Sequence, residues 1–396
     1  MNNKGLLGLI EQLEEQGADD AEKTYQMRQY LQGVARERGI PLHGTFELTP
    51  LCNLSCRMCY VHLSDRQLKK TGRELLTTAQ WKHIMAQAAD AGMISATLTG
   101  GEALTYPGFD ELYLYLLSRG VGVTLKSNGL LMTAERVEFL KKHPVEGVQI
   151  TLYGADNDTY EKVTGVRGFD AALAGIKRVK AAGIPLEVNI TPTKPAMPDM
   201  EKLLTLVDSL DVRVGISSGL YPAREETERH VQNLQPTPED YVALYKTQAR
   251  LKNQKLVPMD PHELPPPGGG GHEPVLGLPC GGGRSGFAVH WNGRIHPCLS
   301  LDAISADALN APFIEGWKTV HRAVESYPFP GECTGCVYRN ICTPCVLSHE
   351  WGDNPGHPNR FFCERSQRMF AEGLLVRKDN SKGEKEYEKS ISEAPC

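Results

Sequence analysis

Six short apolar segments alternate with helical patterns along the first half of the chain. They read GTFELTP (44–50), ISATLTG (94–100), GVGVTLKS (120–127), GVQITLYG (147–154), PLEVNIT (185–191) and VRVGISSG (212–219). In residues 168–183, Phe169, Leu173 and Ile176 recur at helical spacing, and Gly183 is a suitable C-terminal stop. Six strand–helix units in succession predict an α/β fold with a parallel sheet, either open or rolled into a barrel.

Length and charge narrow the class of protein. A chain of 396 residues exceeds one ordinary core, so more than one domain is expected. No apolar run approaches the ~20 residues of a membrane span. Residues 1–16 mix apolar and charged side chains as an amphipathic helix does, which predicts no signal peptide and a cytoplasmic protein. A net charge of −5 gives no basic footprint for nucleic acid, so neither nucleic acid nor membrane is an expected partner.

The eleven cysteines fall into two fields. Three lie at 52–59, none between 60 and 279, seven between 280 and 363, and one is the last residue. Without a secretory signal, such clusters indicate metal binding or chemistry and not a disulfide framework. A Pro/Gly-rich stretch ends before Cys280. We therefore expect an N-terminal helical segment (1–43), an α/β body (44–235), a helix and linker (236–279), a cysteine-rich domain (280–372) and a charged tail (373–396).

The first field, Cys52, Cys56 and Cys59, offers three ligands where a closed zinc site needs four. Three thiolates suit a metal with one open position, such as one iron of a [4Fe–4S] cluster. The triplet follows the first predicted strand, TGGEA (99–103) follows the second and KSNG (126–129) follows the third. Ligands bind at the carboxyl ends of parallel strands, so these loops are expected to form one site. A partial zinc site is the competing interpretation.

These motifs resemble those of radical S-adenosylmethionine (SAM) enzymes: CNLSCRMCY matches their CxxxCxφC loop, with Met58 at φ and Tyr60 closing the motif, and GGE matches the loop after strand two. The resemblance implies a partial (βα)6 barrel and a [4Fe–4S] cluster that chelates SAM. It further implies that Gly100, Gly101 and Glu102 receive the SAM amine and that Ser127 and Asn128 bond its ribose or carboxylate. Thr151 stands where relatives carry serine, and Lys162 either pairs with the SAM carboxylate or is an exposed helix lysine. Ala103 replaces the usual proline.

The second field contains two CxxC pairs, Cys333–Cys336 and Cys342–Cys345, which alone would suggest a zinc knuckle. Beside the first field they resemble a SPASM domain, an extension that carries auxiliary iron–sulfur clusters. Asn292-Gly293 predicts a type I′ turn in its β-hairpin. The resemblance implies two auxiliary [4Fe–4S] clusters, one held by Cys333, Cys336, Cys342 and Cys363, and one held by Cys280, Cys298 and Cys345 alone.

SPASM relatives are mainly peptide and protein modifiers, so the expected substrate is a peptide or protein that loses a hydrogen atom to a 5′-deoxyadenosyl radical. Crosslinking, such as thioether formation, and epimerisation are both open. A tetrapyrrole-modifying enzyme of haem biosynthesis is the alternative, and a zinc-binding interaction protein is the more remote one. Residues 1–43 are too short for the leader-binding module of many peptide maturases, so two expectations stay open: a separate leader-binding protein, or a substrate that has no leader. An electron donor such as flavodoxin or ferredoxin is also expected.

Overall fold

The computed structural model describes residues 8–10, 13–15, 17, 19–224, 227, 231–256, 280–328, 330–334, 336–338, 342, 345 and 357–374. The predicted Pro/Gly-rich linker at 257–279 and most of the charged tail lie outside these residues. The described strands form one nine-stranded sheet in the order β6-β5-β4-β3-β2-β1-β7-β8-β9.

All six predicted strands are present and pair in parallel, which confirms the partial-barrel prediction. They are β1 (His43–Glu47), β2 (Ser95–Thr99), β3 (Gly122–Ser127), β4 (Gly147–Thr151), β5 (Leu186–Ile190) and β6 (Arg213–Ile216). The C-terminal region contributes β7 (Gly286–Val289), parallel to β1, then β8 (Arg294–His296) and β9 (Ala306–Asp307), both antiparallel. The sheet therefore crosses the predicted boundary between the α/β body and the cysteine-rich domain.

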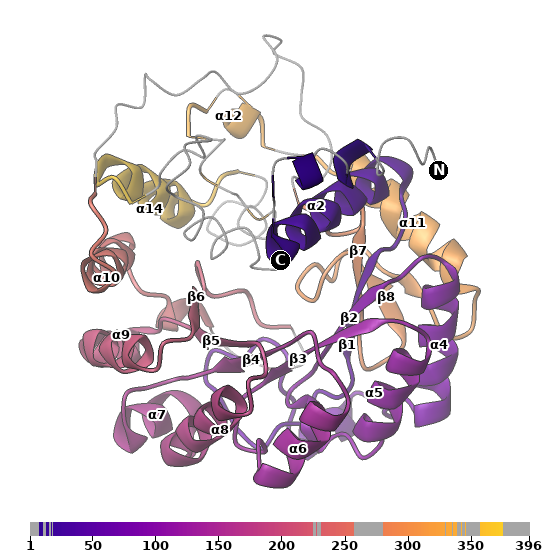
Figure 1. Ribbon diagram of the computed structural model, residues 1–396, viewed down its shortest axis with the longest axis horizontal. Coiled ribbons are helices and arrows are strands. Elements are labelled where there is room, and N and C mark those ends of the chain that lie inside the picture. The colour runs from indigo at the N-terminus through magenta and orange to yellow at the C-terminus, as the bar shows by residue number, and fades with distance from the viewer. Residues whose placement is uncertain are drawn as a thin grey trace.

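Helices cover the outer face of the sheet (Figure 1). Those between strands are α3 (Asp65–Lys70), α4 (Thr78–Asp90), α5 (Phe109–Ser118), α6 (Ala134–Lys142), α7 (Asn157–Thr164), α8 (Phe169–Ala181) and α9 (Met200–Ser209), with the short 3₁₀ turns η1 (Ala103–Thr105) and η2 (Lys194–Asp199). The helix predicted in 168–183 is α8, and Gly183 follows it with φ +70°. Thr77 begins α4 with a capping box, which satisfies otherwise orphaned N–H groups.

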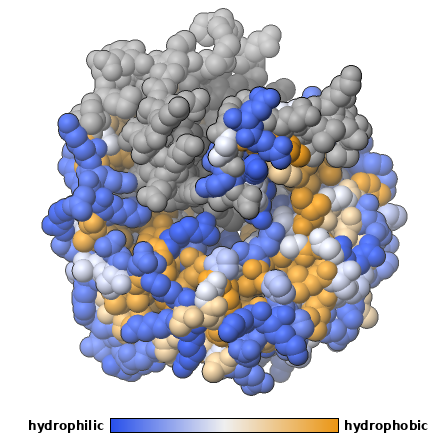
Figure 2. All heavy atoms as spheres, in the orientation of Figure 1, coloured by the Kyte–Doolittle hydropathy of each residue, from blue (hydrophilic) through white to orange (hydrophobic). Residues whose placement is uncertain are grey.

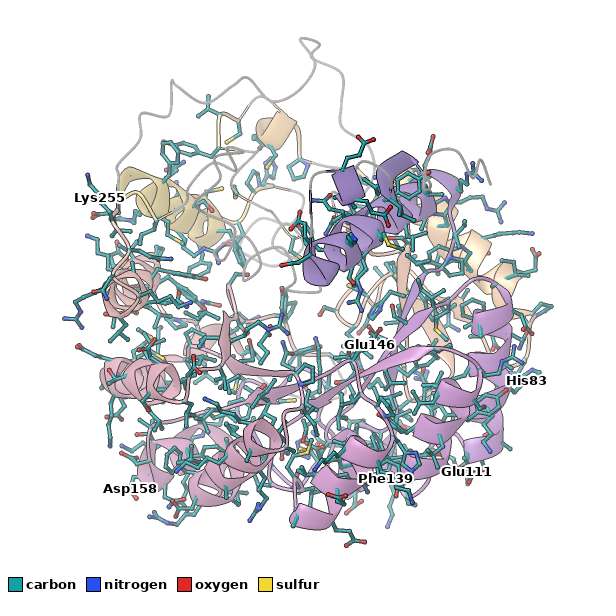
Figure 3. The ribbon with its side chains drawn as sticks, in the orientation of Figure 1. His83, Glu111, Phe139, Glu146, Asp158 and Lys255 are labelled. Atoms are coloured by element: carbon teal, nitrogen blue, oxygen red, sulfur yellow. The ribbon has the colours of Figure 1, made fainter. Side chains whose placement is uncertain are left out.

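The remaining helices lie N-terminal to β1 and around the cysteine-rich region. They are α2 (Asp20–Arg38), η4 (Val231–Leu234), α10 (Pro238–Leu251), α11 (Phe313–Glu325), α12 (Gly331–Thr334) and α14 (Arg360–Ala371). Figure 3 labels residues of the outer helices, and His83, Glu111 and Asp158 point away from the sheet into solvent. On the face drawn in Figure 2, hydrophilic residues dominate the outer rim.

The two faces of the sheet differ in chemistry. The helix-facing residues are apolar and at most 2% exposed: Phe46, Leu98, Val123, Leu125, Val148, Ile150, Val188 and Ile190. The opposite face, here called the polar face, carries half-buried polar side chains: Thr45, Thr124, Lys126, Gln149, Thr151, Glu187 and Asn189. Period-two alternation of this kind leaves one face for the core and the other for a ligand.

The hairpin between β7 and β8 differs from the prediction in its turn. Gly293 has φ +80°, but Asn292 does not have the positive φ that a type I′ turn requires. The Gly293 N–H donates to His290 O at 2.9 Å, and the His290 N–H donates to Arg294 O at 3.0 Å. The loop is therefore a three-residue connection with glycine in the left-handed region, a form that suits the same Asn-Gly sequence.

Candidate functional site

The cysteine triplet lies in the loop that follows β1, at the carboxyl edge of the sheet. Cys56 is buried, while Cys52 and Cys59 are half-buried. The Leu54 N–H donates to Cys52 Sγ and the His62 N–H donates to Cys59 Sγ, each at 3.3 Å. Burial raises the pKa of Cys52 to about 12, so the thiolate form requires a metal beside it. Amide donors aimed at sulfur are the surroundings that a thiolate-bound cluster needs, and the three residues fit one.

Gly100 and Gly101 allow the loop after β2 to approach the cysteine loop. The Gly101 N–H donates to Thr49 O at 2.7 Å and the Glu102 N–H donates to Leu51 O at 3.0 Å. A Cβ at Gly100 would lie 2.5 Å from Thr49 O, and one at Gly101 would lie 2.3 Å from Leu51 O. Both glycines are therefore required sterically, because any side chain would push the two loops apart.

Glu102 connects the loop after β2 to the loop after β3. Its carboxylate accepts from the Asn128 N–H at 2.8 Å, from Ser127 Oγ at 3.2 Å and from the Leu104 N–H at 3.2 Å. The residue is 1% exposed, and burial raises the pKa of its carboxyl to about 7 against the opposing effect of these donors. The Asn128 side chain lies 3.7 Å from Cys52 Sγ. Glu102, Ser127, Asn128 and Cys52 thus form one contiguous group.

The remaining residues of the predicted SAM site differ in burial. Met58 is buried, and Thr151 ends β4 half-buried. Lys162 is exposed on α7, although its helix end holds the cysteine loop, since Val163 O and Thr164 O accept from the Arg57 and Ser55 N–H groups. Tyr60 packs edge-on against Tyr221, with ring centroids 6.2 Å apart.

An ion pair that the sequence did not reveal lies beside Tyr60. Arg224 donates to both carboxylate oxygens of Glu47 at 2.8 and 2.9 Å, and the Glu47 side chain is fully buried. The same guanidinium donates to Leu299 O at 2.7 Å, and the Arg224 backbone N–H donates to Tyr60 O at 3.2 Å. Arg224 therefore joins β1 and the cysteine loop to the segment that carries Cys298. A charged residue near the end of an apolar strand, Glu47, was the only signal in the sequence.

The C-terminal cysteines lie in two groups. The Cys333 thiol interacts electrostatically with Cys363, Cys336 and Cys342, and burial raises its pKa to about 12. In the second group, Cys280, Cys298 and Cys345 pack around Leu301 and Val324. The described residues thus separate these seven cysteines into a group of four and a group of three.

The four-cysteine group also has polar surroundings suited to an anionic centre. The Ser366 hydroxyl donates to the Cys342 sulfur, and the buried Arg365 guanidinium lies close enough to favour its thiolate. Nε and Nη1 of Arg365 have no hydrogen-bond partner in the described part of the chain. A buried cation in this state fits an iron–sulfur cluster at the four cysteines.

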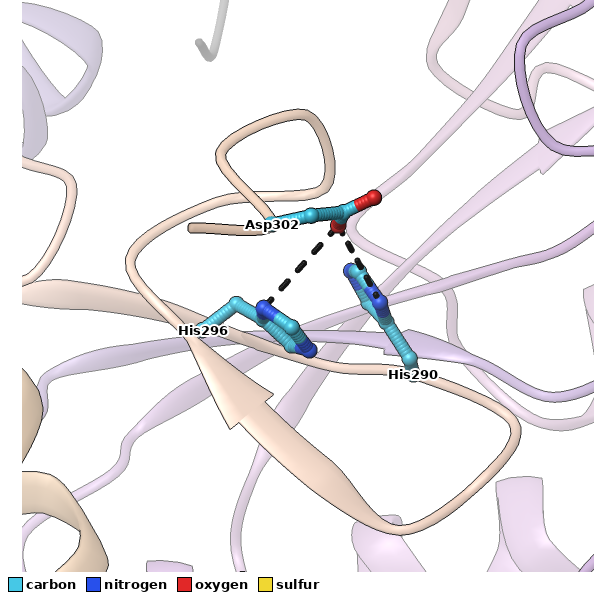
Figure 4. A group of neighbouring side chains, drawn as sticks. All are labelled: His290, His296 and Asp302. Atoms are coloured by element: carbon cyan, nitrogen blue, oxygen red, sulfur yellow. Dashed lines mark ion pairs between the residues drawn. The ribbon is translucent and has the colours of Figure 1, made fainter. Parts of the chain in front are cut away.

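His290, His296 and Asp302 form a third polar group, near the carboxyl end of β7 (Figure 4). The two imidazole rings are stacked, with centroids 3.8 Å apart and planes within 16° of parallel. Imidazole binds metal through a lone pair in its ring plane, so two nearly parallel rings cannot direct both lone pairs at one ion. Arg224 Nη2 also lies 3.0 Å from His290 Nε2. His290 therefore belongs to the hydrogen-bond network around Arg224, and the three side chains in this arrangement do not form a metal site.

The chain is similar to several known proteins. Among curated proteins, AdoMet-dependent heme synthase of Methanosarcina barkeri is 28% identical over 322 residues, which cover 76% of this chain and 89% of that protein. The sporulation killing factor maturation protein SkfB of Bacillus subtilis is 37% identical over 153 residues, 38% of this chain and 36% of that one. Streptococcus suis SuiB bound to precursor peptide SuiA has the same fold, with a TM-score of 0.62 at 17% identity and coverage of 87% and 81%.

No helix in the described ranges has both the length and the apolar character needed to cross a bilayer.

Residues 46–207 match the family model of the radical SAM superfamily, and this match spans β1 to α9 with the cysteine triplet and the GGE loop inside it. The matched residues therefore form a radical SAM domain, a family whose enzymes use a [4Fe–4S] cluster and SAM, and a cysteine-rich C-terminal region follows this domain.

Proposed function

We propose that the enzyme modifies a peptide or protein, and that Cys52, Cys56 and Cys59 hold the SAM-binding cluster. When bound, that cluster supplies the electron that cleaves SAM into methionine and a 5′-deoxyadenosyl radical. The support for the ligand set is the loop position of the three thiols and the two backbone amides directed at their sulfurs. The radical chemistry that SAM would supply there would remove a hydrogen atom from the substrate.

The chain's own part in SAM binding is to fix three loops. Glu102 holds the loop of Ser127 and Asn128 against the GGE loop, and Gly101 holds the GGE loop against the cysteine loop. We propose that Gly100, Gly101, Glu102, Ser127, Asn128 and Thr151 line the SAM site, with Met58 and Tyr60 supporting the cysteine loop. The exposed Lys162 side chain can turn toward the cysteine loop and pair with the SAM carboxylate.

The polar face is the observation that carries the choice of substrate. Lys126, Gln149, Glu187 and Arg213 are register neighbours across β3, β4, β5 and β6. Beside them, Asn189 Nδ2 donates to Ser217 Oγ at 3.3 Å. Amide, hydroxyl and charged groups in a row suit the N–H and C=O groups of a peptide, because each can donate or accept. A tetrapyrrole would require a large apolar surface, which this face does not present within the described residues.

We further propose that Cys333, Cys336, Cys342 and Cys363 hold one auxiliary [4Fe–4S] cluster and that Cys280, Cys298 and Cys345 hold another through three ligands. The support is the separation of these cysteines into two groups. An external donor such as flavodoxin or ferredoxin would supply the electrons. A separate leader-binding protein would present the substrate. The proposed place of action is the cytoplasm.

The test is turnover by the anaerobically reconstituted enzyme with SAM, dithionite and a candidate peptide encoded beside its gene. Mass spectrometry should show a peptide product that has lost hydrogen or changed stereochemistry. A parallel reaction with a haem-precursor tetrapyrrole should show none, and the opposite pattern would overturn the proposal. Gln149→Ala should raise the KM for the peptide while SAM cleavage persists. Gln232→Ala, an exposed glutamine on η4, is the matched control and should change neither.

A further inference from the structure

Arg365 is a buried cation on α14. The residue is 9% exposed, and neither Nε nor Nη1 has a hydrogen-bond partner within the described ranges. No described carboxylate lies within ion-pair distance of it, although Arg368 on the same helix pairs with Glu239 at 2.8 Å. A guanidinium keeps its charge when buried, so its position requires a compensating group.

Aromatic rings supply part of that compensation. The guanidinium carbon lies 5.1 Å from the ring centroid of Phe362, 5.7 Å from that of Tyr241 and 5.9 Å from that of Phe361. Ring faces attract a cation, but this attraction is weaker than that of a full negative charge. The three rings also exclude water, which strengthens any charge interaction that Arg365 makes.

The four-cysteine group is the negative charge in reach. Arg365 follows Cys363 by two residues on α14, and Arg365 is close enough to Cys342 to favour its thiolate. The neighbouring Ser366 hydroxyl donates to the same sulfur. A [4Fe–4S] centre held by four thiolates has a net negative charge in both of its common oxidation states, and reduction makes that charge larger.

We propose that Arg365 is the counter-ion of the centre at Cys333, Cys336, Cys342 and Cys363 and that it shifts this centre toward the reduced state. This inference rests on the ligand set proposed above. Reduction adds one electron from the external donor to the centre, and Arg365 itself exchanges neither an electron nor a proton. Its fixed charge stabilises the more negative, reduced form more than the oxidised form, so it raises the reduction potential.

The test uses the full-length reconstituted enzyme and three variants: Arg365→Met, Arg365→Lys and Arg368→Met. The centre is followed by electron paramagnetic resonance during a potentiometric titration, and its signal is assigned as the one lost in Cys363→Ser. In Arg365→Met the reduced-to-oxidised ratio at a fixed potential should fall at least tenfold, which is 59 mV for a one-electron couple. In Arg365→Lys this ratio should fall less, because lysine keeps the positive charge, although on a shorter side chain. Arg368→Met makes the same change of charge on the same helix, and its reduced-to-oxidised ratio should stay near that of the parent.

Equal shifts in Arg365→Met and Arg368→Met, or no shift in either, would overturn the proposal. If Arg365→Met fails to retain the centre, iron analysis distinguishes a counter-ion role of Arg365 from a packing role. Loss of about four irons in Arg365→Met with retention in Arg365→Lys supports the counter-ion role, whereas loss in both indicates a packing role and contradicts it. Zinc in place of iron in the parent enzyme would overturn the cluster assignment itself. An unchanged potential with iron present would overturn only the role of Arg365.

Discussion

The two cysteine sites differ in how the buried charge beside each of them is compensated. Beside Cys52, the Glu102 carboxylate accepts three hydrogen bonds from the chain itself. Beside Cys342, the Arg365 guanidinium has two nitrogens without a partner among the described residues. The first site is organised by its own backbone and is ready to receive a cofactor. The second has a charge that is balanced only when its cofactor is present, so its structure and its cofactor should depend on each other more strongly.

The largest expected effect is at the first site. Replacing Cys52, Cys56 and Cys59 together with alanine should abolish 5′-deoxyadenosine formation while the auxiliary iron remains, because the triplet packs against a different core cluster from the C-terminal cysteines. Chromatography of the nucleoside and iron analysis measure the two quantities. Continued 5′-deoxyadenosine formation by this triple variant would show that the first site is not the SAM cluster.

The backbone organisation of the first site can be broken at one glycine. Gly101→Ala places a Cβ 2.3 Å from Leu51 O, and this clash should lower the free energy of unfolding by about 3 kcal/mol and weaken SAM binding. Gly147→Ala is the matched control, because its Cβ would meet only Pro185 O, at 3.7 Å. Denaturant unfolding of both variants checks the prediction, and equal stability of the two would contradict it.

Glu102→Gln makes a smaller change in the same loop contact. The substituted amide nitrogen cannot accept from Asn128 N–H and Ser127 Oγ, as the carboxylate oxygen Oε2 does. Losing a hydrogen bond to a charged group costs about 1.5–3 kcal/mol, so the Kd for SAM should rise by roughly one to two decades. Calorimetric titration with SAM measures this, and a Kd equal to that of the parent would refute the assignment of Glu102 to SAM binding.

The smallest expected effect concerns the second field. The C-terminal region has seven cysteines apart from Cys396, one fewer than two fully thiolate-bound clusters need. Ordering the charged tail would cost entropy with few apolar contacts in return, so Cys396 is not expected to be the missing ligand. Removal of residues 377–396 should therefore leave about twelve irons per chain, if all three clusters are [4Fe–4S]. Loss of about four irons would show instead that Cys396 closes the site.

The features predicted correctly from the sequence are the local ones. Strand periodicity located all six parallel strands, and the GGE loop and the cysteine triplet lie at the strand ends where that periodicity placed them. The Glu47–Arg224 pair joins residues 177 positions apart, so no spacing rule could indicate it. Asn292-Gly293 predicted a turn but the wrong type, because several turn types accept the same residues. Arg365 gave no signal, since arginine on a helix is ordinarily exposed.

The pairing of β1 with β7 has a consequence for synthesis of the chain. Phe46 and Val289 are register partners. One edge of β1 therefore stays unpaired until the chain has been extended by a further 289 − 46 = 243 residues. At roughly 5–20 residues per second, the ribosome needs roughly 10–50 s to supply it. For that interval the nascent chain presents an unpaired strand edge beside a loop of three reactive thiols, which makes chaperone protection and late cluster insertion the expected order of events.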